Sequence, residues 1–99
     1  MAYKVKVNKR FNIKVARVYE YLSKKWGFKE ADNFYDKVTK KLDLVERQPE
    51  LGTLSIKKKN VRSVLVTKYN RIYYRFQKNT VTVLNMIDTR TNPLDNPYS

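Results

Sequence analysis

The sequence predicts an α+β domain, with an N-terminal strand, an antiparallel helical hairpin and a three-stranded antiparallel meander, in which the helices cover one face of the sheet. Two observations lead to this prediction. Apolar residues recur at helical spacing between residues 11 and 45, and three strand-like runs, two rich in β-branched residues and one alternating between them, follow one another between residues 61 and 87. The 99 residues are enough for one modest core, so residues 1–99 are expected to form a single domain.

The first strand is predicted for Ala2 to Val7. Tyr3, Val5 and Val7 alternate with lysines there, which indicates a strand with one buried face. The lysines are expected to be solvated charges of an outer strand, where charge also discourages pairing with other chains.

Two helices are predicted next. Asn8 is a plausible N-cap for a first helix of roughly 15 residues, and Gly27 fits the position that ends it. The second helix stops before Pro49. Because the join at residues 27–29 is short, the helices must run antiparallel. Their apolar stripes are expected to be core, and they consist of Phe11, Val15, Val18, Tyr19, Leu22 and Trp26, then Ala31, Phe34, Tyr35, Val38, Leu42 and Val45.

The meander is predicted from three runs, Val61–Thr67, Asn70–Gln77 and Val81–Ile87. Side chains alternate between the two faces of a strand, so the middle run has an apolar face and a basic-aromatic face. The apolar face carries Ile72, Tyr74 and Phe76, and the basic-aromatic face carries Arg71, Tyr73 and Arg75. The second face is the expected functional surface, and residues 94–99 are expected to form a frayed tail.

Charge is the strongest compositional signal. The net charge is +13, and residues 1–30 and 56–99 each carry nine basic and two acidic residues. Such a surface attracts polyanions such as nucleic acid, or an acidic protein. The chain has no cysteine, no apolar run of roughly 18 residues and no apolar leader, which favours a cytoplasmic protein without a membrane span. Asp36 and Asp43 are expected to pair with neighbouring lysines at helical spacing, and the carboxylates show no convergence, so neither a metal nor a cofactor is expected.

Several stretches together resemble the RelE/ParE superfamily of bacterial toxins from type II toxin–antitoxin systems. They are the order of elements, the turn Pro49–Gly52, the run NVRSVLVTKYNRIYYRF at residues 60–76, and Asp88-Thr89-Arg90. The resemblance implies a toxin neutralised by a co-expressed antitoxin, which should be acidic here. RelE-like members cleave mRNA in the ribosomal A site without a metal, whereas ParE-like members poison DNA gyrase. Arginines expected on one strand face favour RNA cleavage, with gyrase inhibition as the alternative and a plain nucleic-acid-binding module as a third possibility.

The resemblance also implies catalytic roles for three arginines. Arg71 matches the arginine that opens the middle strand in RelE-like toxins, Arg62 lies near a family lysine, and Arg90 lies near the C-terminal family arginine. Val64 stands where a second lysine is expected, and Tyr98 is the only candidate for the family's downstream catalytic tyrosine. With no histidine in the chain, these cations would stabilise the charge that develops when the 2′-hydroxyl attacks the phosphate.

Five further residues are candidates for substrate binding. They are Lys57, Lys58 and Lys59, which lead into the basic strand, and Tyr73 and Arg75. Tyr73 could stack on a base or pack on the sheet. Each basic candidate also has a structural alternative: the lysines as a solvated loop, Arg71 and Arg75 as surface charges, and Arg90 as the ion-pair partner of Asp88.

Overall fold

The computed structural model describes residues 3–98. Ala2, the first residue of the predicted N-terminal strand, and Ser99, the last residue of the predicted tail, lie outside this range. In chain order the elements are β1 (Lys4–Val7), α1 (Lys9–Trp26), α2 (Phe28–Arg47), the 3-10 helix η1 (Pro49–Leu51), β2 (Thr53–Leu54), β3 (Val61–Thr67), β4 (Asn70–Gln77), β5 (Thr80–Asp88) and the 3-10 helix η2 (Pro93–Asp95).

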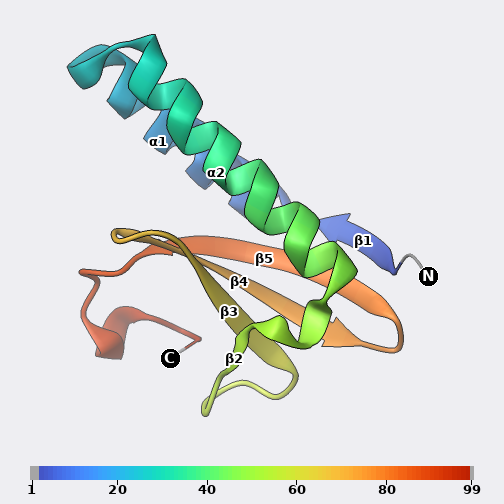
Figure 1. The fold of residues 1–99 in the computed structure, drawn as a ribbon. Helices are drawn as coiled ribbons and strands as arrows, with labels where there is room; N and C mark the ends of the chain where they lie inside the picture. Colours follow the sequence, from blue (N-terminus) through green and yellow to red (C-terminus); the bar gives the residue numbers. More distant parts are fainter. Residues whose placement is uncertain (1–2, 99) are drawn as a thin grey trace.

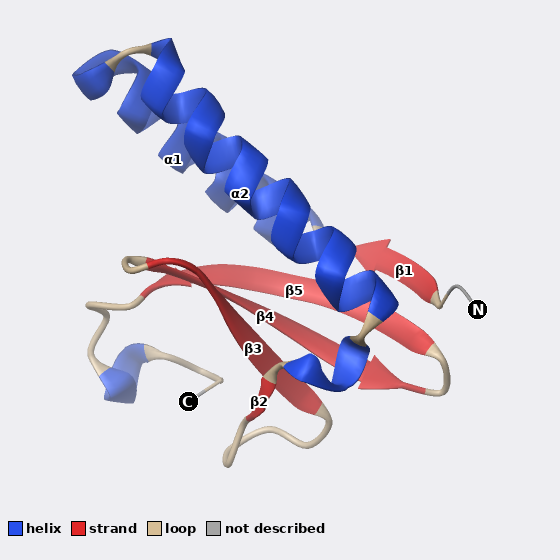
Figure 2. Cartoon of the chain, in the orientation of Figure 1, coloured by secondary structure: helices blue, strands red, loops and turns tan. Residues whose placement is uncertain are grey.

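The elements form two layers, a sheet in the order β1-β5-β4-β3-β2 and a helical hairpin across one of its faces (Figures 1 and 2). Strands β3, β4 and β5 are the predicted antiparallel meander, which is confirmed. The sheet is mixed rather than wholly antiparallel, because β1 pairs with β5 in parallel. The short strand β2 adds a fifth strand at the opposite edge.

The hairpin turns at a single residue. Gly27 has a φ of 96°, a conformation that side-chain-bearing residues rarely adopt, and it ends α1 while α2 begins at the next residue. The hairpin extends past the sheet, so only the first half of α1 contributes buried residues, Phe11 and Val15 (Figure 1). Trp26, predicted as core, is instead 64% exposed because no strand lies beneath it.

The main core lies between the hairpin and the sheet, and it joins residues from both helices to the apolar faces of β3, β4 and β5. A bulge in β5 shifts its alternation, since Tyr73 pairs with Asn85 but Tyr74 pairs with Val83. Met86 therefore faces the helices, whereas Leu84 faces the opposite side. A second, smaller cluster on that side contains Val61, Tyr73, Leu84 and Ile87, with Tyr98 packed against it.

The first strand is at the sheet edge. Val5 and Val7 remain 39% and 43% exposed, so the predicted buried face of this strand is wrong for these two residues. The hairpin does not cover the edge fully. Tyr3 does pack inward, with its ring edge-on to Phe76 at 5.2 Å between centroids.

The connection from α2 to the sheet is anchored by a buried phenol. Tyr74 is fully buried; its hydroxyl donates to the carbonyl oxygen of Pro49 at 2.6 Å and accepts from the backbone N–H of Gly52 at 2.9 Å. A Cβ on Gly52 would lie 2.5 Å from that hydroxyl oxygen. The predicted turn at Pro49–Gly52 is thus built around this contact.

The C-terminal segment lies against the sheet, where the sequence indicated a frayed tail. Asn96 is buried, its side-chain amide donates to the Tyr73 hydroxyl at 3.1 Å, and Ser55 donates to the carbonyl oxygen of Tyr98. Within residues 3–98, no helix has the length and apolar character needed to span a membrane.

Candidate functional site

Two surfaces of the protein are candidates for function. One is the sheet face opposite the hairpin, called here the open face, which carries Arg71, Tyr73 and Arg75 of β4. The other is a groove between α1 and α2. The structure brings together only some of the site residues predicted from the sequence.

Arg71 lies on the open face beside a small cavity. Its guanidinium donates to the Ser63 hydroxyl at 2.9 Å, a contact across the β3–β4 pair. The neighbouring cavity has a volume of about 270 Å³. It is lined by Arg71, Tyr73, Ile87, Asp88, Thr89, Thr91, Pro93 and Asn96. The lining offers one cation with several hydroxyl and amide groups, and its one carboxylate, Asp88, is paired with Arg90. Such a site can take a small anion, and it makes Arg71 the best-placed of the predicted arginines for phosphate binding.

Arg75 is on the same face, four residues further along β4. It is half-buried between Val61 of β3 and Thr82 of β5. Among the hydrogen bonds and salt bridges of residues 3–98, its guanidinium makes none, so its charge is not neutralised by a carboxylate. Arg71 and Arg75 are the two predicted arginines that share a face.

Tyr73 is covered in this structure. The ring of Tyr98 stacks on it with centroids 4.9 Å apart, and only 7% of the residue is exposed. In this arrangement Tyr73 packs within the protein, and its ring has no free face on which a base could stack.

Arg62 does not join the other arginines. It pairs in register with Tyr74, and paired residues point to the same side of a sheet, so Arg62 faces the hairpin side. Its guanidinium donates to the carbonyl oxygens of Glu50 and Gly52 at 3.0 Å and 2.9 Å. These bonds hold the η1–β2 connection, and the expected cluster of Arg62 with Arg71 on one strand face is not present.

Arg90 forms the ion pair with Asp88 that the sequence left as an alternative. Its Nε and Nη2 atoms lie 3.0 Å and 2.7 Å from the two carboxylate oxygens, and the guanidinium lies 4.3 Å from the centre of the Tyr69 ring. The hydrogen bond and charge of Arg90 lower the pKa of Asp88, and Asp88 in turn raises the pKa of Arg90. Asp88 is a weak proton acceptor near neutral pH for this reason, although it lines the Arg71 cavity.

The three predicted lysines are in an exposed loop. The backbone N–H groups of Lys57 and Lys58 donate to the Ser55 hydroxyl oxygen at 3.1 Å and 3.0 Å, which shapes the start of the loop. Lys57, Lys58 and Lys59 are all exposed. Their side chains can meet a large polyanion, but they do not line the Arg71 cavity.

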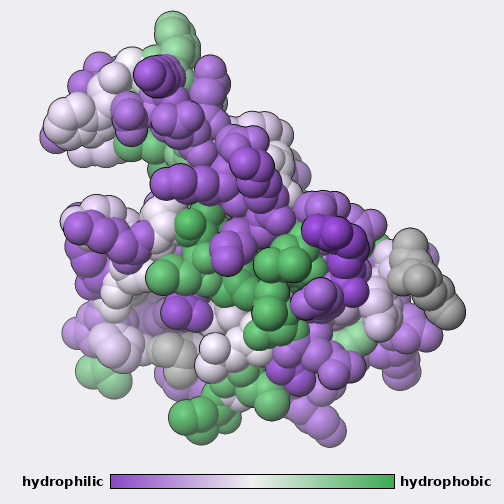
Figure 3. Space-filling view, in the orientation of Figure 1, coloured by the Kyte–Doolittle hydropathy of each residue, from purple (hydrophilic) through white to green (hydrophobic). Residues whose placement is uncertain are grey.

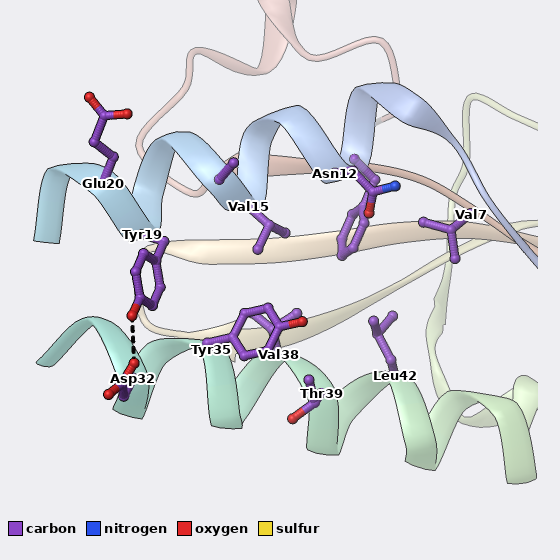
Figure 4. Close-up of a pocket in the computed structure, with 12 residues that line it drawn as sticks. Val7, Asn12, Val15, Tyr19, Glu20, Asp32, Tyr35, Val38, Thr39 and Leu42 are labelled. Carbon is purple, nitrogen blue, oxygen red and sulfur yellow. Dashed lines mark hydrogen bonds between the residues drawn. The ribbon is translucent and has the colours of Figure 1, made fainter. Parts of the chain in front are cut away.

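Sequence reasoning missed the groove between the helices, because it assigned every apolar stripe to the core. The groove has a volume of about 810 Å³ and is mostly apolar (Figure 4). It is lined by Val7, Phe11, Asn12, Val15, Ala16, Tyr19, Glu20, Asp32, Tyr35, Val38, Thr39 and Leu42. The sequence held one signal of this groove. Phe34 and Tyr35 are adjacent on a helix, so the two side chains cannot both face the sheet; Phe34 is buried and Tyr35 is 51% exposed.

The groove is bounded at one end by a hydrogen bond and reaches the sheet edge at the other. The Tyr19 hydroxyl donates to Asp32 at 2.6 Å, linking α1 to α2, and this bond raises the pKa of Tyr19 (Figure 4). At the other end a second hollow of about 310 Å³ shares Val7, Thr39 and Leu42 with the groove and reaches the exposed edge strand β1. Together they form an apolar channel of a size that suits a helix or an extended peptide.

Comparison with known families decides the class of protein. Residues 5–93 match the family model described as the ParE toxin of the type II toxin-antitoxin system, parDE. The chain belongs to the ParE toxin family. It is therefore a toxin of a type II toxin–antitoxin system, and its partner is an antitoxin, as the RelE/ParE resemblance implied.

Solved structures share the fold of this ParE-family toxin. A chain of the chromosomal ParDE TA system from P. aeruginosa superposes with a TM-score of 0.74 at 11% identity, covering 87% of this chain and 95% of that one. A chain of the YoeB dimer from Staphylococcus aureus gives a TM-score of 0.58 at 12% identity, covering 86% and 94%. Comparison with curated proteins gave no match.

Proposed function

We propose that this toxin acts by binding and inhibiting its target, and that the target is DNA gyrase, as expected for a ParE-like member of the superfamily. The observation that supports this is the dispersal of the three arginines that RNA cleavage would need. Arg62 holds backbone carbonyls on the hairpin side, and Arg90 is paired with Asp88. Only Arg71 faces the open-face cavity.

The cavity also offers few groups for the proton transfer of a ribonuclease, because its lining contains Asp88 and the buried Tyr73 but no lysine or histidine. Cleavage requires a residue that can accept the 2′-hydroxyl proton near neutral pH. Asp88 is the carboxylate that lines the cavity, and its lowered pKa makes it a poor acceptor. Val64 is an apolar residue of the main core where a catalytic lysine is expected, so it cannot supply the missing charge. Binding without chemistry fits these features better.

The antitoxin is proposed to occupy the groove between α1 and α2. The groove is apolar, open and large enough for the apolar face of an amphipathic helix. The charged side chains that line the groove are Glu20 and Asp32, but the whole chain has a net charge of +13, so an acidic antitoxin would be attracted to the toxin over a long range. Both gyrase and the ribosome are cytoplasmic, so the toxin is proposed to act there.

A supercoiling assay tests the proposed mechanism. Purified toxin is added to DNA gyrase and relaxed plasmid, and the expected result is a dose-dependent loss of supercoiling that excess antitoxin reverses. Arg71→Ala should retain inhibition, since no cleavage chemistry is involved. Unimpaired supercoiling at toxin concentrations well above those of gyrase would contradict the proposal.

RNA cleavage remains a second candidate because Arg71 and the neighbouring Arg75 share the open face beside a cavity that suits a phosphate. Mapping of RNA 5′ ends minutes after toxin induction tests it. New ends in phase with codons, absent for Arg71→Ala, would support a ribosome-dependent interferase. Growth arrest without such ends would exclude it and leave the arginine face as a binding surface.

A further inference from the structure

The end of the helical hairpin that projects beyond the sheet carries exposed aromatic side chains. This hairpin tip, residues 21–29, includes Tyr21, Trp26 and Phe28, which are 56%, 64% and 71% exposed. The projection is visible in Figure 1, and Figure 3 shows apolar atoms at the surface of the same outer end, among hydrophilic ones. Large aromatic side chains that gather at a projecting end of a soluble protein indicate a binding surface.

The fold accounts for Tyr21, which lines a hollow with Tyr69 and Arg90, but not for Trp26 and Phe28. Neither Trp26 nor Phe28 belongs to the main core or to the smaller cluster on the open face. Gly27, with its φ of 96°, separates them and joins the two helices without a flexible loop. The aromatic rings are therefore mounted on the rigid ends of two helices, which lowers the entropy lost when a partner binds them.

The charge of the tip defines the partner. Residues 21–29 contain Lys24, Lys25 and Lys29 and are flanked by Glu20 and Glu30, so residues 20–30 carry a net charge of +1. The one salt bridge described there joins Lys24 to Glu20 in the preceding turn, with both side chains well exposed. A second copy of this chain, with its own net charge of +13, would be repelled.

We propose that the hairpin tip is a docking surface for an acidic protein, with Trp26 and Phe28 filling an apolar pocket rimmed by carboxylates. The lysines steer the encounter, and the aromatic rings supply most of the affinity. The identification of this acidic protein with the toxin's target rests on the proposed function. The tip is separate from the antitoxin groove, because none of residues 21–29 lines that groove.

Trp26 offers a direct probe, since it is the only tryptophan in the chain. Toxin labelled with 5-fluorotryptophan has a single fluorine resonance, which reports on the tip alone. Titration with purified DNA gyrase is expected to shift and broaden this resonance, and raising the salt concentration should weaken the effect because the lysines contribute. Inhibition of gyrase with an unchanged resonance would overturn the proposal. So would a response to tRNA or to anionic phospholipid vesicles in place of the protein.

Variants test the role of the hairpin tip independently of the identity of the target. The Trp26→Ala, Phe28→Ala double variant is expected to lose growth arrest and to require about tenfold or more protein for the same inhibition. Leu94→Ala is the matched control, because it removes an 88% exposed apolar side chain far from the tip in the sequence. Circular dichroism should be the same for all three proteins, since the replaced side chains lie outside the core.

Two further measurements keep the tests independent. Reversing the charges of Lys24, Lys25 and Lys29 to glutamate should weaken activity as well, whereas arginine at the same positions should retain it. If wild-type toxin arrests growth but spares gyrase, the proposed target is wrong, and growth arrest still tests the tip. Full toxicity of both the aromatic double variant and the glutamate variant would overturn the docking surface.

Discussion

Tyr98 stacks on Tyr73 across the open face of the sheet, with ring centroids 4.9 Å apart and an interplanar angle of 23°. The sequence offered Tyr98 only as a loosely placed catalytic tyrosine and Tyr73 as a base-stacking residue. Their contact with each other, supported by Asn96 at the Tyr73 hydroxyl, joins the C-terminal segment to the smaller hydrophobic cluster. The aromatic residue of the predicted nucleic-acid surface, Tyr73, therefore packs within the protein and is covered by Tyr98.

Removal of the Tyr98 ring should destabilise the protein. Tyr98→Ala is expected to lower the free energy of unfolding by about 1–2 kcal/mol, because a stacked aromatic pair and its buried area are lost. Urea unfolding followed by circular dichroism measures the change. Tyr98→Phe keeps the ring and should be nearly neutral. Equal stability of the alanine variant and wild type would show that the segment contributes nothing to the fold.

The two glycines should respond to alanine for different reasons. At Gly52 the φ is −70°, an ordinary value, but the new Cβ would meet the Tyr74 hydroxyl, so we expect a loss of about 1–3 kcal/mol from overpacking. At Gly27 nothing lies within 4 Å, and the strain comes from the backbone, whose φ of 96° and ψ of 168° essentially only glycine adopts, with an expected loss of about 1–3 kcal/mol.

A second substitution at each glycine separates the two causes. Combining Gly52→Ala with Tyr74→Phe removes the clashing hydroxyl, so part of the steric cost of the alanine should disappear in a double-mutant cycle. Asparagine tolerates the left-handed α region better than alanine, but the backbone of Gly27, with φ 96° and ψ 168°, lies in a region that essentially only glycine adopts. Gly27→Asn should therefore melt below wild type, as Gly27→Ala should. A melting temperature of either variant equal to that of wild type would contradict the strain argument.

The Asp88–Arg90 pair should make a small contribution to stability that depends on pH. The folded state lowers the pKa of Asp88, so its carboxylate stabilises the fold above the ordinary aspartate pKa of about 3.9, and this stabilisation is lost as the pH falls through the folded value. Solvent screens the pair, because the Asp88 side chain is 43% exposed.

Comparison with Asp88→Asn measures that contribution. At neutral pH wild type should melt slightly above the variant, and the difference should shrink through the acid range below the ordinary aspartate pKa. A carboxyl titration followed by NMR should place the Asp88 midpoint below the ordinary aspartate pKa of about 3.9. A difference in melting temperature that grows on acidification would contradict the ion pair.

The groove predicts a variant that is toxic but no longer neutralised. Ala16 is exposed and lines the groove on α1, so Ala16→Arg should place a long charged side chain where the antitoxin is proposed to bind. Growth arrest is expected to persist when the cognate antitoxin is co-expressed, with antitoxin affinity reduced about tenfold or more. Arg17→Ala is the control, since Arg17 is exposed on α1 but does not line the groove. Full rescue of Ala16→Arg would place the antitoxin elsewhere.

Local sequence patterns were sufficient to predict most of the fold. Helical spacing from Phe11 to Val45, the stop at Gly27 and Pro49, and the alternation in Asn70–Gln77 depend on neighbouring residues, so the hairpin and the meander could be read directly. The parallel pairing of β1 with β5 and the bulge at Leu84 could not be read, because register and strand order depend on partners distant in the chain.

The sequence by itself determined that this protein is a basic α+β domain, since composition and periodicity are properties of the chain alone, and the toxin class entered through the family resemblance. Only the tertiary structure decided which predicted residues meet. Strand alternation places Arg62 on the hairpin side, and Arg90 forms an ion pair with Asp88. Trp26 lies outside the core because the hairpin is longer than the sheet beneath it. A functional site forms only where its side chains come together in space, and the packing of segments that are distant in the chain decides which side chains do so.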